Sequence, residues 1–142
     1  MEYVLFKIKK ILDKDFINNY DLLVIPSFPF NKRIKLNDIK IIPGNKNRID
    51  QITIKHPYNK DNTSKELLLN TYIKLLDIIK INEYKNILID YRYIPIINEC
   101  SSFNNKEICH KIYNLINEYI KDKEINITIV ISNKKDKKYY FD

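Results

Sequence analysis

Apolar and polar residues follow strand patterns in several separate segments of the chain. Residues 3–12 and 51–56 alternate apolar with polar side chains, which predicts half-buried strands. Residues 21–25 and 86–90 are short continuous apolar runs, typical of strands that are covered on both faces. Residues 125–132 are rich in β-branched side chains and predict a further strand.

Two segments carry apolar residues at helical spacing. Thr63 and Glu66 have the spacing of a capping box, so the first helix is predicted to begin at Thr63. Asn104 and Glu107 are predicted to cap the second helix. The residues expected on the two buried stripes are Leu68, Tyr72, Leu75, Leu76 and Ile79, and then Ile108, Ile112, Leu115, Ile116 and Tyr119.

The remaining segments have weaker patterns. Residues 13–20 are polar and predict a turn, and Pro26 is expected to end the apolar run that follows. Residues 139–141 predict a short last strand, and Gly44 marks a polar turn. Two short alternating pieces lie between Pro26 and Gly44, namely Ile34 with Leu36 and Ile39 with Ile41.

The order strand, helix, strand, helix, strand over residues 51–132 predicts parallel pairing with right-handed crossovers in an α/β fold. With 142 residues and no linker or repeat, residues 1–142 are expected to form a single domain. Ligands of such sheets bind outside the carboxyl ends of the strands. That rule nominates residues 26–30, 56–61 and 91–104, together with Asn133 and its neighbours.

The connection at residues 91–103 is unusually long, since links from strand to helix usually have about 2–6 residues. Asn98, Ser101 and Ser102 stand just before the predicted helix, where backbone N–H groups and the helix dipole favour an anion. The alternative is a loop packed by its own apolar side chains, with Ser102 only capping the helix.

The composition of the chain excludes several classes of function. Hydrophobic residues make up 44% of the chain, enough for a core, but no apolar run is long enough for a membrane helix and no leader opens the chain. We therefore expect a soluble, cytoplasmic protein without a membrane partner. Gly44 is the only glycine, which excludes the Walker loop and the dinucleotide-binding fingerprint. Cys100 and Cys109 are too few for a disulfide scaffold, and no spacing predicts a metal site.

The net charge of +7 has two explanations. A basic protein attracts polyanions, so a nucleic-acid-binding domain is one of them. The lysines are scattered, however, and only residues 134–138 hold a dense group, Lys134, Lys135, Lys137 and Lys138. An AT-rich coding sequence would produce the same excess of lysine, isoleucine and asparagine, and we favour that second explanation.

Four stretches together resemble a macro domain, the module that binds ADP-ribose and related nucleotides. No single match is specific, but their order and spacing follow the family over nearly the whole chain. The resemblance implies a three-layer α/β/α fold with a mixed central sheet. The four stretches are Asp15-Phe16-Ile17 with the strand at 20–24, residues 51–57 ending in His-Pro, the segment 66–88, and Ile94-Pro95-Ile96 with Ser101-Ser102-Phe103.

The resemblance also implies roles for individual residues. Asp15 would accept a hydrogen bond from the adenine amine, and Phe16 would supply an adjacent backbone amide. The N–H groups of residues 101–103, Ser101, Ser102 and Phe103, would replace those of the family's second phosphate loop. Asn133 would lie beside the adenine or its ribose. Without the resemblance, Asp15 is read as a solvated turn residue and Asn133 as a residue that ends a strand.

The sequence departs from the family where its enzymes need particular residues. Residues 25–28 read Ile-Pro-Ser-Phe in place of the usual Asn-Ala-Ala-Asn stretch, which places Ser27 at the ligand, and the glycine-rich loop is absent. Glycine lets backbone amides approach a diphosphate closely. The expected function is therefore non-catalytic binding, for sensing or sequestration, of an ADP-ribose-type nucleotide derived from NAD. We expect no cofactor, and a role in NAD-derived signalling such as antiviral immunity or its counter-measures.

Other readings remain open at this point. A hydrolase or transferase acting on ADP-ribosylated substrates, or on cyclic or modified ADP-ribose, would use Asn98 or Cys100. Cys100 with His56 as base would make a cysteine nucleophile. A nucleic-acid-binding domain and a structural remnant that acts through a partner protein are the other two alternatives.

Overall fold

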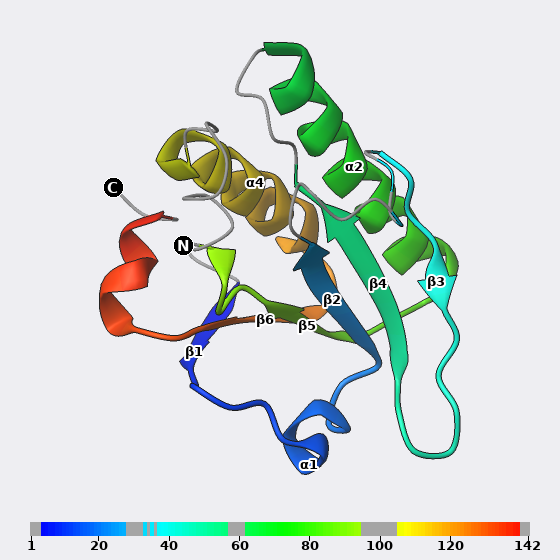
Figure 1. Ribbon diagram of the computed structural model, residues 1–142. Helices are drawn as coiled ribbons and strands as arrows, with labels where there is room; N and C mark the ends of the chain where they lie inside the picture. The colour runs from blue at the N-terminus through cyan, green and yellow to red at the C-terminus, as the bar shows by residue number, and fades with distance from the viewer. Residues whose placement is uncertain are drawn as a thin grey trace.

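The computed structural model describes residues 4–27, 33, 35, 37–56, 62–94 and 105–139. Within them the chain forms one six-stranded sheet with helices (Figure 1). The strands are β1 (Leu5–Ile8), β2 (Leu22–Ser27), β3 (Ile41–Ile42), β4 (Asp50–Lys55), β5 (Asn86–Asp90) and β6 (Asn126–Ile131). The helices are α1 (Lys14–Ile17), α2 (Asn62–Ile81), α4 (Asn105–Ile120) and the 3₁₀ helix η1 (Lys134–Tyr139).

The sheet has the strand order β1-β6-β5-β2-β4-β3. β2 pairs in parallel with both β4 and β5, and β6 pairs in parallel with β5 and β1. Of the described strands, only β3 is antiparallel to its neighbour. The connections through α2 and α4 both run toward the β1 edge, so right-handed crossovers place the two helices on the same face. Figure 1 shows α2 and α4 side by side on that face. The predicted mixed α/β sheet is confirmed.

The main core lies between the sheet and these two helices. All five predicted stripe residues of α2 are buried, and Ile108, Ile112 and Ile116 of α4 are buried with them. Leu115 and Tyr119 pack against the same core from its margin. Helical periodicity therefore predicted the packed face of both helices, because only that face meets the apolar side chains of the strands.

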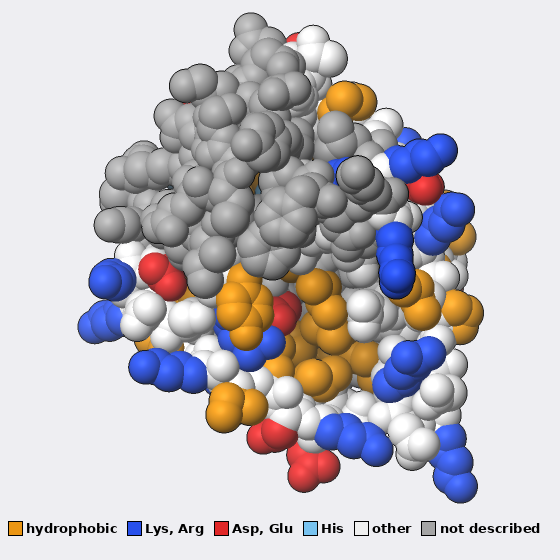
Figure 2. All heavy atoms as spheres, viewed as in Figure 1, with side chains coloured by type: hydrophobic (Ala, Val, Ile, Leu, Met, Phe, Trp, Pro, Cys, Tyr) orange, Lys and Arg blue, Asp and Glu red, His pale blue; other side chains and the backbone are white. Residues whose placement is uncertain are grey.

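The opposite face of the sheet has a smaller apolar cluster, formed by Leu23, Leu88 and Val130. Within the described residues, the segment 9–20 with α1 packs against it through Leu12, Phe16 and other half-buried side chains. Figure 2 shows a hydrophobic group on the visible face, with Lys and Arg side chains around it.

Four predictions of local structure are wrong. Pro26 does not end its strand. β2 pairs with β5 only up to Val24, and beyond it the strand pairs with β4 alone, so a residue without an N–H is tolerated there. α2 begins at Asn62, so Thr63 is helical rather than a cap; several neighbouring residues have cap-forming side chains, and the pattern could not choose among them. The predicted turn at residues 13–20 contains α1, and Tyr139 belongs to η1 rather than a strand. Ile34, Leu36 and Asn104 lie outside the described residues.

Gly44 is the glycine that the turn between β3 and β4 requires. A Cβ atom at this position would lie 2.3 Å from Arg48 O and 2.6 Å from Ile49 C, both of which are backbone atoms. The Gly44 N–H also donates to Asp50 Oδ1 at 2.7 Å, and Tyr84 OH donates to Asp50 Oδ2 at 2.6 Å. These two hydrogen bonds lower the pKa of Asp50 and join the turn to the start of β5.

Gly44→Ala is expected to destabilise the protein by roughly 1–3 kcal/mol, because the backbone of the turn must move to admit the methyl group. Urea unfolding measures this change. Lys46→Ala in the same turn is the matched control, since Lys46 is exposed, and it should stay within about 0.5 kcal/mol of wild type. Equal stabilities of the two variants would contradict the prediction.

Candidate functional site

The carboxyl ends of the parallel strands define the candidate site, which we call the carboxyl edge. β2 ends at Ser27, β4 at Lys55, β5 at Asp90 and β6 at Ile131. The connections that follow β2, β4 and β5 all leave from this edge. In an open sheet with parallel strands, this is the edge at which ligands bind.

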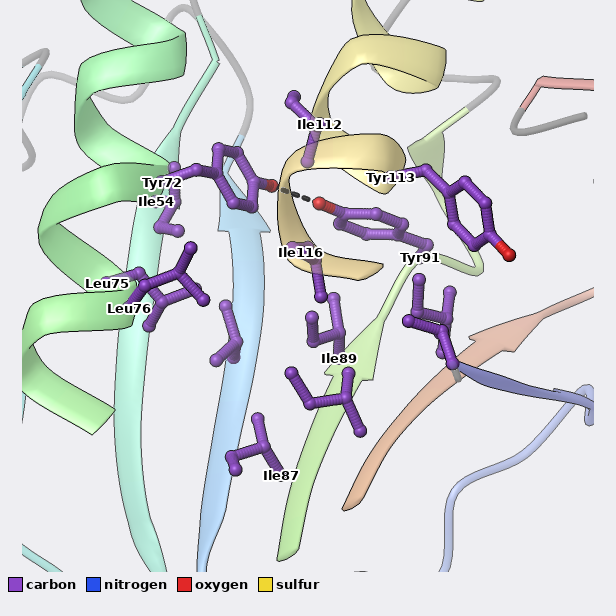
Figure 3. Close-up of a cluster of buried hydrophobic side chains, with 14 of the residues drawn as sticks. Ile54, Tyr72, Leu75, Leu76, Ile87, Ile89, Tyr91, Ile112, Tyr113 and Ile116 are labelled. Carbon is purple, nitrogen blue, oxygen red and sulfur yellow. Dashed lines mark hydrogen bonds between the residues drawn. The ribbon is translucent and has the colours of Figure 1, made fainter. Parts of the chain in front are cut away.

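A chain of buried polar side chains joins the ends of β4 and β5 through α2, below this edge. The backbone N–H of His56 also donates to Ser27 O at 3.3 Å, which ties the end of β4 to the end of β2. His56 Nε2 lies 3.3 Å from Tyr72 OH, and Tyr72 OH is hydrogen-bonded to Tyr91 OH. Figure 3 shows the two tyrosines pointing toward each other from α2 and from the end of β5.

Burial keeps this His56–Tyr72–Tyr91 chain neutral. Burial lowers the pKa of His56 to about 4, so the imidazole is uncharged at neutral pH. Burial also raises the pKa of Tyr72 well above its usual value. Among the described residues, His56 Nδ1 has no hydrogen-bond partner. A buried neutral imidazole of this kind supports the strand ends, and Cys100, the nucleophile considered beside it, lies outside the described residues.

A second network fixes the ends of β5, β6 and β1. Arg92 Nε and Nη2 donate to the two carboxylate oxygens of Asp90, each at 2.9 Å. Arg92 Nη1 donates to Lys10 O at 3.0 Å, and Ser132 Oγ donates to Arg92 O at 3.0 Å. The hydrogen bonds to Asp90 raise the pKa of Arg92, so its guanidinium stays charged. The long connection that carries the predicted anion site therefore starts from a fixed point.

The structure places Asp15 and Phe16 in α1. Asp15 is exposed. The Phe16 N–H, predicted to face adenine, donates to Asp13 Oδ1 at 2.8 Å, because Asp13 is the N-cap of α1. An adenine ring would have to replace that capping bond. Lys9 Nζ lies 4.2 Å and Lys7 Nζ 5.4 Å from the centre of the Phe16 ring.

Ser27 and Asn133 lie at the ends of different strands. Ser27 is buried at the end of β2, and its carbonyl accepts from His56 N–H. Asn133 is exposed between β6 and η1, and its carbonyl accepts from Asp136 N–H. No contact among the described residues brings either one to Asp15. Asn98, Ser101, Ser102 and Phe103 lie outside the described residues.

Sequence reasoning missed the Asp90–Arg92 pair and the two hydroxyl groups of Tyr72 and Tyr91. The signal for the pair was present, since an aspartate and an arginine flank the end of a strand that is otherwise apolar. Tyr72 was expected as a core residue, which is correct for its ring but says nothing of its hydroxyl. Within the described ranges, His, Cys, Asp and Glu form no group of three that could hold a metal ion. No helix in that part of the chain is long and apolar enough to cross a membrane.

This arrangement of strands and helices is the macrodomain fold. A mutant macrodomain from Oceanobacillus iheyensis with ADPR matches over 91% of this chain and 87% of its own, with a TM-score of 0.65 and 11% identity. The macro domain of ganglioside induced differentiation associated protein 2 matches over 85% of this chain and 74% of its own, with a TM-score of 0.65 and 12% identity. Thermosipho africanus DarTG in complex with ADP-ribose matches over 92% of this chain but only 44% of its own, with a TM-score of 0.56 and 7% identity. No protein-family model and no curated protein matches the sequence.

Proposed function

We propose that this protein binds an ADP-ribose-type, NAD-derived nucleotide at the carboxyl edge and does not hydrolyse it. The observation that carries the proposal is the macrodomain fold, since two of the solved structures above hold ADP-ribose. The two polar networks support it, because they hold the ends of β2, β4, β5 and β6 in fixed positions from which ligand-binding connections can start.

The absence of glycine from this edge supports binding without turnover. The single glycine, Gly44, is committed to the turn between β3 and β4, where a side chain would collide with backbone. Any diphosphate at the carboxyl edge is therefore held by amides of residues with side chains, which restricts how closely the backbone approaches it. The reacting positions of the family's enzymes are also replaced, by Pro26 and Ser27 among others.

A ligand panel with purified protein tests this function. ADP-ribose, cyclic ADP-ribose and NAD are compared by thermal shift, because a ligand that binds only the native state must raise the melting temperature. We expect at least one of the three to do so, with ribose 5-phosphate as the control that does not. A parallel assay with an ADP-ribosylated protein should show no release of ADP-ribose. A panel without any shift would refute binding, and release of ADP-ribose would refute the non-catalytic assignment.

Asp15→Ala is expected to weaken binding by roughly 1–3 kcal/mol and to remove discrimination between adenine and hypoxanthine ligands, because the adenine amine loses its acceptor. Isothermal titration calorimetry measures both effects. Asp122→Ala removes another exposed carboxylate, beyond the end of α4, and should leave the affinity unchanged. If Asp15→Ala binds like wild type, adenine does not lie against α1.

A further inference from the structure

Lysines that are far apart in the sequence gather where β1 and β6 end. The parallel register pairs Lys7 with Val130, and Lys9 N–H donates to Ile131 O at 3.0 Å as the chain leaves β1. The chain leaves β6 directly into η1. The lysines near the end of β1 and those of η1 therefore lie at the same end of this parallel pair. We call this group the lysine edge: Lys7, Lys9, Lys10, Lys134, Lys135 and Lys137.

Arg92 joins the two halves of the lysine edge. Its Nη1 donates to the carbonyl of Lys10, and its own carbonyl accepts from Ser132 Oγ, two residues before Lys134. Hydrogen bonds from the side chains of Arg92 and Ser132 to backbone carbonyls thus link three segments, near residues 10, 92 and 132. Arg92 therefore holds the two groups of lysines at the same end of the β1–β6 pair.

The lysine edge keeps its positive charge. Across the described ranges, none of its six lysines forms an ion pair. Two nearby carboxylates are engaged elsewhere, since Asp90 holds Arg92 and Asp13 caps α1. Asp136, which is buried, and Asp15, which is exposed, are the other two. Lys7 and Lys9 instead lie over the Phe16 ring, and an aromatic ring holds an ammonium group without neutralising it.

An exposed aromatic side chain stands beside these cations. Tyr93 is 47% exposed, and the guanidinium of Arg92 lies 5.1 Å from the centre of its ring. Asp90 and Lys10 hold that guanidinium in place, so the ring has a fixed support on one side. Aromatic rings next to cationic grooves are the platforms on which unpaired bases stack.

We propose that the lysine edge and Tyr93 bind single-stranded nucleic acid, with phosphates on the lysines and one base on Tyr93. Free ammonium groups release counterions from phosphates, which gives sequence-independent affinity. A ring that accepts a base by stacking selects a single strand over a duplex, because bases in a duplex are already stacked. This inference stands apart from the proposed ADP-ribose site.

Fluorescence anisotropy with a labelled single-stranded oligonucleotide of roughly 16 nucleotides tests the proposal across a series of salt concentrations. The triple variant Lys10→Ala, Lys134→Ala, Lys135→Ala should bind at least about ten-fold more weakly at low salt, and the slope of log affinity against log salt should fall by about 2. Tyr93→Ala should weaken binding roughly ten-fold and leave that slope unchanged, and Tyr93→Phe should restore the affinity.

The control triple variant Lys46→Ala, Lys80→Ala, Lys121→Ala removes three exposed lysines outside the lysine edge. Both triple variants remove three lysines and so lower the net charge of +7 by the same amount. A difference in affinity between them therefore reports the position of the lysines rather than net charge. Equal weakening in the two variants would overturn the proposal, and so would binding to duplex as tight as to single strand. Binding to anionic vesicles or an acidic peptide, with none to the oligonucleotide, would also overturn it.

Discussion

Asp90→Ala is expected to lower the free energy of unfolding by roughly 3–5 kcal/mol, the cost of leaving one member of a buried ion pair without its partner. Asp90 is 6% exposed, and it accepts two hydrogen bonds from the Arg92 side chain and one from the Arg92 backbone N–H. Without the carboxylate, a mostly buried guanidinium keeps its charge and loses the acceptors of Nε and Nη2, while Nη1 keeps Lys10 O. A loss of this size is a large part of the total stability of a domain, which is about 5–15 kcal/mol.

Two further variants test the cause of the Asp90→Ala effect by urea unfolding. The double variant Asp90→Ala, Arg92→Leu removes both charges, so it should be more stable than Asp90→Ala alone. Asp38→Ala removes one partner of an exposed ion pair with Lys40 and should cost only about 0–1 kcal/mol. A double variant that is less stable than the single one would show that Arg92 stabilises the carboxyl edge through Lys10 rather than through Asp90.

The sequence predicted best those elements whose periodicity is strong. β5 has the predicted bounds, and the buried stripes of α2 and α4 are confirmed, because burial on one face leaves a regular mark in the sequence. The order of strands left no such mark. β2 lies between β4 and β5 in the sheet. The sequence could not predict this position, because a right-handed crossover sets the hand of a connection but not how many strands it passes.

The candidate site was harder to predict, because it depends on contacts between distant segments. Asp13 and Asp15 both stand near the start of α1, and the sequence does not show which of them is the N-cap. Because the helix begins at Lys14, Asp13 is the residue that accepts the Phe16 N–H. The charged residues show the same limit. Lys10 and Lys134 are far apart in the sequence, and the β1–β6 register together with Arg92 brings their segments to the same end of the sheet.

The pH dependence of stability is expected to report on His56. Burial lowers the pKa of His56 in the folded protein from 6.5 to about 4. The unfolded chain therefore binds more protons than the folded one between these two pH values, so stability is fully present above pH 6.5 and falls as the pH approaches 4. The expected loss across this window is about 3 kcal/mol, since each unit of pKa difference corresponds to about 1.4 kcal/mol.

His56→Gln isolates this effect, because glutamine can still donate a hydrogen bond to Tyr72 and does not titrate. The variant starts from a lower stability at neutral pH, but its unfolding free energy should fall less from pH 6.5 to 4 than that of the natural protein. Glu107, whose pKa is lowered from 4.5 by Lys111 and Lys65, contributes equally to both. The lowered pKa of Asp50 shifts the proton uptake of that carboxyl below 3.8, outside this window. His110 is present in both proteins, so it does not account for a difference between them. If the unfolding free energy has the same slope against pH in both, His56 is protonated in the folded state. The neutral His56–Tyr72–Tyr91 chain would then be wrong.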